Sequence, residues 1–387
     1  MLSTDLPPLR IKGRALLPIV QGGMGVGVSA HRLAGAVARQ GAVGTLSSVD
    51  LRRHHEDLME KTAKSKDKAL IDAANLEALD REVRWALELA EGQGMIAVNV
   101  MRAVSEYARY VTQACESGAQ AIVVGAGLPL DLPDLAADFP DVALIPVLSD
   151  ARGVAVVLRK WMRKNRLPDA IVIEHPGYAG GHVGAAKIED VHDARFEFPT
   201  VLEGCFKVFD ELGLKREQVP LIMAGGINSP ERVRELIQLG ASGVQLGTAF
   251  AVTQEGDAHP NFKRVLAEAK TEDVVEFMSV AGLPARAVRT PWLDSYLKRL
   301  PGLQARAKER KGCTLNFDCL EVCGLRDGIS KVGQFCIDLH LSAAVKGDVQ
   351  RGLFFRGSSS LPFGSEIRSV RELIAFMLGA FQPGPAT

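Results

Sequence analysis

The sequence predicts an α/β protein built as a (β/α)8 barrel, with a helical insertion after the second strand and a cysteine-containing C-terminal extension. Two observations carry this prediction. Short apolar runs alternate with amphipathic segments eight times within about 250 residues, as expected for repeated βα units around a parallel sheet. Glycine clusters follow most of these runs, where the loops of such a barrel build a binding site.

Each apolar run is too short for a helix and apolar throughout, which is typical of a buried parallel strand. In chain order the eight predicted strands are 16–20, 42–46, 95–100, 121–124, 142–148, 170–173, 221–224 and 243–246. Amphipathic segments between them predict helices, for example over 30–40, 105–117, 153–164 and 230–239. An open, doubly wound sheet is the competing architecture for this pattern.

Two regions exceed a minimal barrel. Residues 50–94 form a charged excursion between the second and third strands, which we expect to be a solvated helical hairpin or cap. Residues 254–387 are expected to be a helical and then cysteine-rich extension packed on the barrel, with an amphipathic helix over 370–378. The barrel itself would then occupy residues 1–253.

Composition excludes several classes of function. The 387 residues are 47% apolar, so the chain is not disordered, and 46 basic residues balance 46 acidic ones. A neutral chain has no overall electrostatic field to attract nucleic acid or an anionic membrane, and no apolar run is long enough to span a bilayer.

Because residues 1–14 lack an apolar core, we expect no signal peptide and a cytoplasmic protein. The oligomeric state is not specified.

Glycines after the last two strands indicate a phosphate site. Gly225, Gly226, Gly247 and Thr248 could supply backbone N–H groups and one hydroxyl, where barrels often bind phosphate. The alternative is that these glycines only form tight βα turns.

His182 is the most informative titratable residue. It ends an Ala-Gly-Gly-His run in the loop after the sixth strand, where an imidazole can exchange a proton with a substrate near neutral pH. The alternative is a loop histidine bonded to backbone. His175 is a second candidate, and the remaining histidines are interpreted as structural.

Five motifs carry a resemblance to a known family. They are PIVQGGMG at 18–25, AGGHVG at 179–184, IMAGGI at 222–227, GASGVQLGTAF at 240–250 and GLPARAV at 282–288. With these motifs the chain resembles the nitronate monooxygenase family, also called 2-nitropropane dioxygenases. These flavoproteins are FMN-dependent TIM-barrel oxidoreductases that are related to flavin-dependent enoyl-ACP reductases and NAD(P)H:quinone reductases.

The resemblance implies a cofactor site and a catalytic residue. His182 would be catalytic, above the isoalloxazine ring of FMN. The residues implied to contact FMN are Gln21, Gly22, Gly23, Met24, Asn99, Gly181, Gly225, Gly226, Gln245, Gly247 and Thr248. The chain departs from the family at Tyr178, where a glutamate is common; its phenol could donate a hydrogen bond to a substrate oxygen or only pack.

The resemblance implies a monooxygenase that converts a small-molecule nitronate and dioxygen into a carbonyl compound and nitrite. His182 would accept the α-proton of a nitroalkane or hydrogen-bond the nitronate oxygens. One alternative is an NAD(P)H-dependent reductase of an enoyl thioester or quinone, in which His182 polarises the acceptor. Others are a flavin-free barrel that binds a phosphorylated ligand, and a scaffold that uses the extension as an interaction module.

Four of the six cysteines crowd into 24 residues. Cys313, Cys319, Cys323 and Cys336 have spacings of x5, x3 and x12, without a C-x2-C pair. Four thiolates suffice for a [4Fe–4S] cluster or a structural zinc ion, and reduced structural thiols are the alternative. A cluster near FMN would favour an electron-transfer reductase.

Overall fold

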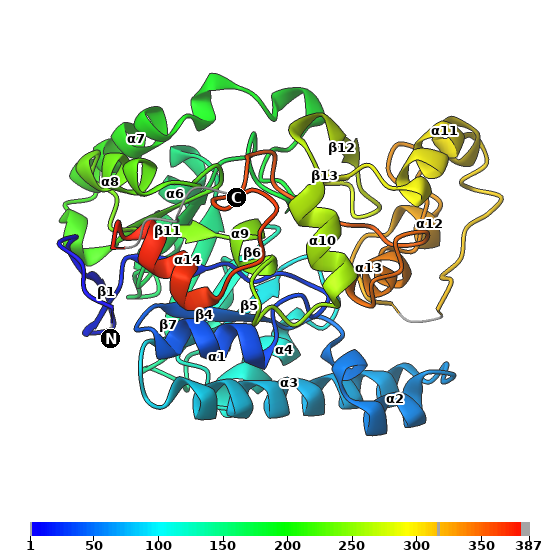
Figure 1. The fold of residues 1–387 in the computed structure, drawn as a ribbon, viewed down its shortest axis with the longest axis horizontal. Coiled ribbons are helices and arrows are strands. Elements are labelled where there is room, and N and C mark those ends of the chain that lie inside the picture. Colours follow the sequence, from blue (N-terminus) through cyan, green and yellow to red (C-terminus); the bar gives the residue numbers. More distant parts are fainter. Residues whose placement is uncertain (1, 316–317, 381–387) are drawn as a thin grey trace.

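The computed structural model describes residues 2–315 and 318–380, and a closed barrel of eight parallel strands lies at its centre (Figure 1). The strands are β3 (Ile19–Gln21), β4 (Val43–Ser47), β5 (Met95–Met101), β6 (Ala121–Gly125), β7 (Ala143–Leu148), β8 (Ile171–Glu174), β10 (Leu221–Ala224) and β11 (Gly243–Leu246). Each pairs in parallel with the next, and β11 pairs with β3. The predicted barrel is confirmed and the open sheet is wrong.

Only the first strand departs clearly from its predicted bounds. Leu16 belongs instead to an antiparallel hairpin of β1 (Leu9–Ile11) and β2 (Arg14–Leu16), and β3 begins at Ile19. Pro18 separates the two, because proline has no N–H to donate to a strand ladder. The hairpin side chains join the apolar core inside the barrel, so this hairpin covers one end of it.

Helices cover the outside of the barrel. They are α1 (His31–Arg39), α4 (Tyr107–Glu116), α5 (Leu132–Leu135), α6 (Ala151–Met162), α7 (Phe198–Glu211) and α8 (Pro230–Gln238). Four of them fall on the amphipathic segments predicted from the sequence. Short 3-10 turns η2 (Ile188–Asp190), η3 (Ala194–Phe196) and η4 (Arg216–Gln218) lie in the connections. Apolar helix faces and outward strand residues form the larger core.

The insertion after β4 is helical, as the sequence predicts. It contains η1 (Leu51–His54), α2 (Glu56–Thr62) and the 23-residue helix α3 (Lys68–Ala90). The Asp67 carboxylate caps α3 by accepting the Ala69 N–H at 2.9 Å. Helix α3 packs along α1 on the outside of the barrel (Figure 1), where Gly35 permits the close approach because an added Cβ would lie 2.6 Å from Leu89 Cβ.

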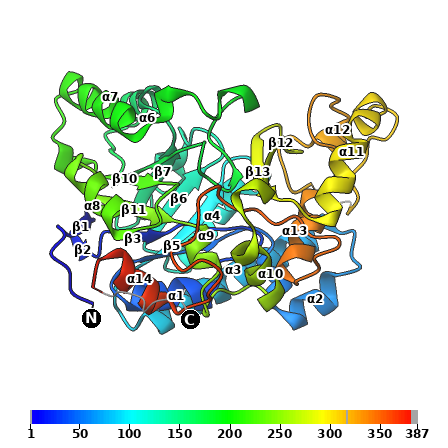
Figure 2. The ribbon, with the colours of Figure 1, turned by 45° about the horizontal axis from the view of Figure 1, so that its top comes forward.

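The segment after β11 contains helices and also an unpredicted β-hairpin. Its helices are α9 (Thr248–Ala251), α10 (Pro260–Glu268), α11 (Pro291–Ala305), α12 (Gly324–Asp327), α13 (Ile337–Val345) and α14 (Val370–Met377), with the 3-10 turn η5 (Thr271–Asp273). The hairpin of β12 (Val274–Met278) and β13 (Pro284–Val288) binds β9 (Gly181–His182). Figure 2 shows α11, α12 and α13 beside the barrel, away from α7 and α8.

Helix α14 returns to the barrel, where it contacts α1 and α8. Within the described ranges no helix is both long and apolar enough to cross a membrane.

Candidate active site

A cavity of about 610 Å³ opens at the carboxyl ends of the barrel strands. Its walls combine the loops after the strands with parts of the segment after β11. The sequence-predicted residues that line it are Gly22, Gly23, Met24, Asn99, Gly181, His182, Gly225, Gly226, Gln245, Gly247 and Thr248. The fold therefore gathers these residues around one space, although they come from six different loops and strands.

Gln21 is placed differently, because its side chain is buried in the wall of the barrel. Its Nε2 donates to the Thr45 carbonyl at 2.9 Å, and its Oε1 accepts the Thr45 N–H at 2.8 Å. The side chain thus braces β3 against β4 and does not line the cavity.

Glycines make the floor of the cavity a backbone surface. A Cβ added to Gly23 would lie 2.3 Å from Asn99 Cβ, so any side chain at Gly23 would displace Asn99. Gly226 adopts a φ of +72°, and an added Cβ would lie 2.8 Å from Tyr178 Cγ. These positions require glycine, and their exposed backbone can approach a ligand closely.

Sequence reasoning missed the residues that close one end of this floor. Gly357 N–H donates to Thr248 Oγ1 at 3.0 Å, and Asn228 Nδ2 donates to Ser360 Oγ at 2.9 Å. Gly357 and Ser360 line the cavity together with Ser359. The Gly-Ser-Ser-Ser run at 357–360 was a signal of an irregular polar loop, but nothing in the sequence places it against the barrel.

His182 lies on β9, half-buried and facing the cavity. Its Nε2 is 3.0 Å from Ser279 Oγ, and its ring lies beside that of Phe355 with the centroids 5.7 Å apart. Burial lowers the pKa of His182 to about 4, so the imidazole is neutral at physiological pH. Ser279 is fully buried and was not predicted, because it comes from a hairpin that the sequence analysis did not identify.

Glu174 is a second titratable group at this cavity. It ends β8, and burial raises the pKa of its carboxyl to about 7 although the nearby Arg286 opposes that shift. The signal for it in the sequence is its position directly after the apolar run 170–173.

Arg286 holds the loop between β8 and β9. Its guanidinium is buried, donates to the Pro176 carbonyl at 2.9 Å and to the Ala179 carbonyl, and pairs with Glu276. This arginine belongs to the GLPARAV motif, in which Arg286 pairs with Gly181 across the β13–β9 ladder. The motif therefore fixes the backbone that carries His182.

Tyr178 and His175 pack on each other in the loop after β8. Their ring centroids are 4.6 Å apart, and the Tyr178 ring covers the turn at Gly226. His175 is buried, and its Nδ1 accepts the Gly177 N–H at 3.0 Å. His175 does not line the cavity, so the structure gives it a place in the loop framework, whereas Tyr178 borders the cavity.

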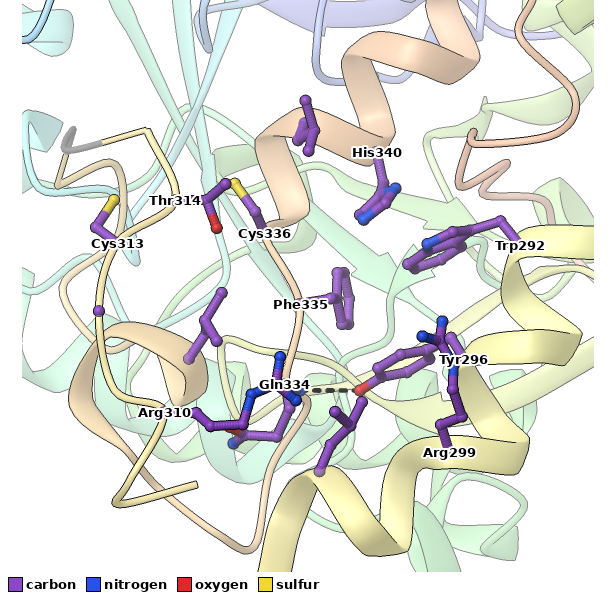
Figure 3. Close-up of a pocket in the computed structure, with 14 residues that line it drawn as sticks. Trp292, Tyr296, Arg299, Arg310, Cys313, Thr314, Gln334, Phe335, Cys336 and His340 are labelled. Carbon is purple, nitrogen blue, oxygen red and sulfur yellow. Dashed lines mark hydrogen bonds between the residues drawn. The ribbon is translucent and has the colours of Figure 1, made fainter. Parts of the chain in front are cut away.

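Three of the four clustered cysteines line this cavity or a second one. Cys319 lines the large cavity, while Cys313 and Cys336 line a neighbouring cavity of about 460 Å³ (Figure 3). Cys323 Sγ accepts the Arg326 N–H at 3.4 Å. In the part of the chain that the structure describes, no three His, Cys, Asp or Glu side chains are arranged to hold a single metal ion.

Comparison with known proteins identifies the family. The family model described as nitronate monooxygenase matches residues 11–378. The chain belongs to the nitronate monooxygenase family. It is thus an FMN-dependent oxidoreductase, and the resemblance found in the sequence is confirmed.

Individual relatives agree with this assignment. The chain is 26% identical over 293 residues to a probable nitronate monooxygenase of Bacillus subtilis (strain 168), covering 72% of this chain and 78% of the relative. It is 31% identical over 133 residues to a putative nitronate monooxygenase of Saccharomyces cerevisiae, about a third of each chain (33% and 32%).

Solved structures show the same fold. FabK from Thermotoga maritima aligns with a TM-score of 0.65 at 22% identity, over 98% of this chain and 96% of that one. A nitroalkane oxidase from Streptomyces ansochromogenes aligns with a TM-score of 0.64 at 18% identity, over 97% and 96% of the two chains.

Proposed function

We propose that this protein is a nitronate monooxygenase that oxidises alkyl nitronates with dioxygen to a carbonyl compound and nitrite. The observation that carries the proposal is the His182 imidazole, which faces the glycine-lined cavity with its Nε2 3.0 Å from the buried Ser279 hydroxyl. Family membership supports it, and favours a flavin enzyme over a flavin-free phosphate-binding barrel.

The cavity fits FMN. Its floor is backbone that no Cβ could occupy at Gly23 and Gly226, which is the surface that a flat ring and a phosphate need. We assign the phosphate to the N–H groups of the turns at Gly225–Gly226 and Gly247–Thr248, closed by Gly357. Gly22, Gly23, Met24, Asn99, Gly181 and Gln245 would border the remainder of the cofactor.

Bound FMN would supply the electron chemistry, and the chain would bind and orient the substrate. Ser279 Oγ accepts the Ala281 N–H at 3.2 Å, which leaves its own proton to be donated to His182 Nε2. In that arrangement Nδ1 carries the ring proton and would donate it to a nitronate oxygen. Aliphatic side chains such as Val28 and Met101 line the cavity and would exclude water from the alkyl group.

The low pKa of His182 selects between the two roles considered for it. A base whose pKa is about 4 removes a carbon-bound proton poorly at neutral pH. The substrate should therefore be the nitronate, which is already ionised, and not the neutral nitroalkane. His182 then acts as a hydrogen-bond donor to the anion.

One observation favours a second candidate function. Val104, Leu320 and Leu341 add an apolar wall to the cavity at the boundary with the extension, which would accept a longer acyl chain or a quinone. In this alternative the protein reduces an enoyl thioester or quinone with NAD(P)H, and His182 hydrogen-bonds the acceptor oxygen.

Product analysis tests the proposal. FMN-loaded protein is supplied with propane-2-nitronate, with 2-nitropropane, or with NADPH plus a quinone. We expect nitrite and acetone from the nitronate at a rate at least about tenfold above that from 2-nitropropane. Absence of nitrite together with rapid NADPH-dependent quinone reduction would overturn it in favour of the reductase.

A further inference from the structure

The extension gathers four thiols that the proposed nitronate reaction does not use. Cys336 precedes α13, Cys323 precedes α12, and Cys313 and Cys319 lie in the loop after α11. In Figure 3, Cys313 and Cys336 stand on the same side of the smaller cavity, on two separate stretches of chain.

The loop that carries two of these thiols is fastened to the barrel. Glu321 N–H donates to the Ala103 carbonyl at 2.9 Å, and Ser105 N–H donates to the Cys319 carbonyl at 3.3 Å. The Arg326 guanidinium donates to the carbonyls of Leu320 at 2.6 Å and Glu321 at 2.9 Å. The Cys319 thiol is thereby held in the wall of the large cavity.

The thiols influence one another electrostatically. Cys313, Cys323 and Cys336 all lie close enough to Cys319 to act on its thiol group electrostatically. Cys313 and Cys323 likewise act on Cys336. The four half-buried thiols are therefore gathered in one region, and they would become thiolates when a metal centre replaces their protons.

We propose that Cys313, Cys319, Cys323 and Cys336 bind a [4Fe–4S] cluster between the extension and the barrel. A single zinc ion, with Zn–S bonds of about 2.3 Å, would draw its ligands tightly together. Over residues 2–315 and 318–380 no such tight group is present. A four-iron cluster takes one thiolate on each iron and holds the sulfurs more widely apart. Because Cys319 lines the large cavity, the cluster would lie next to the cofactor site, where it would serve the reductase given above as the second candidate function.

Metal analysis tests this proposal independently of FMN and of turnover. The full chain is purified without oxygen, treated with ferrous iron and sulfide under reducing conditions, and desalted. We expect about four iron and four acid-labile sulfide per chain. Cys313→Ser and Cys336→Ser should each lose most of this iron, whereas Cys115→Ser should keep it, because Cys115 is a buried thiol of α4 and not one of the four proposed ligands.

A second measurement covers the case in which the serine variants do not fold. In the loaded wild-type protein the four thiols should resist alkylation, and removing iron with a chelator should make them reactive. Iron and sulfide both well below one per chain after reconstitution would overturn the proposal. Stoichiometric zinc instead of iron and sulfide would also overturn it, as would an unchanged iron content in folded Cys313→Ser protein.

Discussion

His182 Nε2 lies 3.0 Å from Ser279 Oγ, and 97 positions separate the two residues in the sequence. Ser279 directly follows β12, and β13 pairs with β9, the strand that carries His182. The candidate catalytic imidazole is therefore positioned by the segment after the barrel, and not by the barrel strands alone. This relationship makes the hairpin β12–β13 part of the site.

Removing the Ser279 hydroxyl should weaken catalysis without releasing the cofactor. Ser279→Ala is expected to lower kcat/KM for a nitronate roughly tenfold, the effect of one lost hydrogen bond that orients His182. FMN content should be unchanged, and Ser279→Thr should restore most of the activity because it keeps a hydroxyl.

The matched control for this change is Ser117→Ala, which removes another buried hydroxyl, bonded to the Gln113 carbonyl at 2.8 Å at the end of α4. Steady-state kinetics with stoichiometric FMN make the comparison. Full kcat/KM in Ser279→Ala would show that His182 needs no such partner.

A methyl group at Gly226 should impair FMN binding. In Gly226→Ala the new Cβ would press on the Tyr178 ring, at 2.8 Å from Cγ, and the φ of +72° would be strained. We expect the Kd for FMN, measured by fluorescence titration, to rise at least about tenfold.

Gly213→Ala is the matched control, because Gly213 has a similar φ of +69° and nothing lies within 4 Å of its added Cβ. Gly213→Ala introduces a similar backbone strain without a steric clash, so its Kd for FMN should equal that of the wild type. Equal FMN affinity in the two variants would remove the Gly226 turn from the cofactor site.

Arg286→Gln should destabilise the fold and release the β8–β9 loop. The buried guanidinium bonds two loop carbonyls and pairs with Glu276, so its loss leaves buried groups without partners. We expect the free energy of unfolding, from urea titration, to fall by about 3 kcal/mol. Arg289→Gln is the control: Arg289 is 54% exposed and pairs with Asp294, so its replacement should lower the free energy of unfolding only slightly. Similar losses in both variants would contradict the role given to Arg286.

Two residues at the cavity should give opposite dependences of stability on pH. The pKa of His182 is about 4 in the folded protein and 6.5 in the unfolded chain. As the pH falls from 6.5 to 4, the unfolded chain therefore takes up this proton more readily, and the free energy of unfolding decreases. The pKa of Glu174 is about 7 in the folded protein and 4.5 in the unfolded chain. As the pH rises from 4.5 to 7, the folded protein therefore holds this proton longer than the unfolded chain does, and the free energy of unfolding decreases.

Variants separate the two contributions between pH 4.5 and 6.5, where both groups titrate. Relative to wild type, Glu174→Gln should become more stable as pH rises, and His182→Gln less stable, each by up to about 1.4 kcal/mol per pH unit. Urea unfolding at several pH values measures this. Parallel curves for the three proteins would show that neither pKa is shifted.

The barrel could be predicted because each strand is an unbroken apolar run followed by glycine or a polar residue. Buried parallel strands require that pattern, and the glycine-rich turns at Gly225–Gly226 and Gly247 follow from it. Pro18 has no N–H to donate to a strand ladder, which explains why β3 begins later than expected.

The rest of the candidate site depends on contacts between distant parts of the chain. Ser279, Gly357 and Ser360 reach the cavity from the segment after β11, and no local pattern specifies which strand or loop they meet. The low pKa of His182 is likewise a consequence of burial, which a single loop sequence does not show.

The most direct test of the account is an anaerobic reduction of the FMN-loaded protein, followed by flavin absorbance. We predict that propane-2-nitronate bleaches the flavin without any nicotinamide nucleotide, and that His182→Gln slows this bleaching at least about a hundredfold. A flavin that NADH or NADPH bleaches while the nitronate leaves it oxidised would contradict the account and identify a reductase.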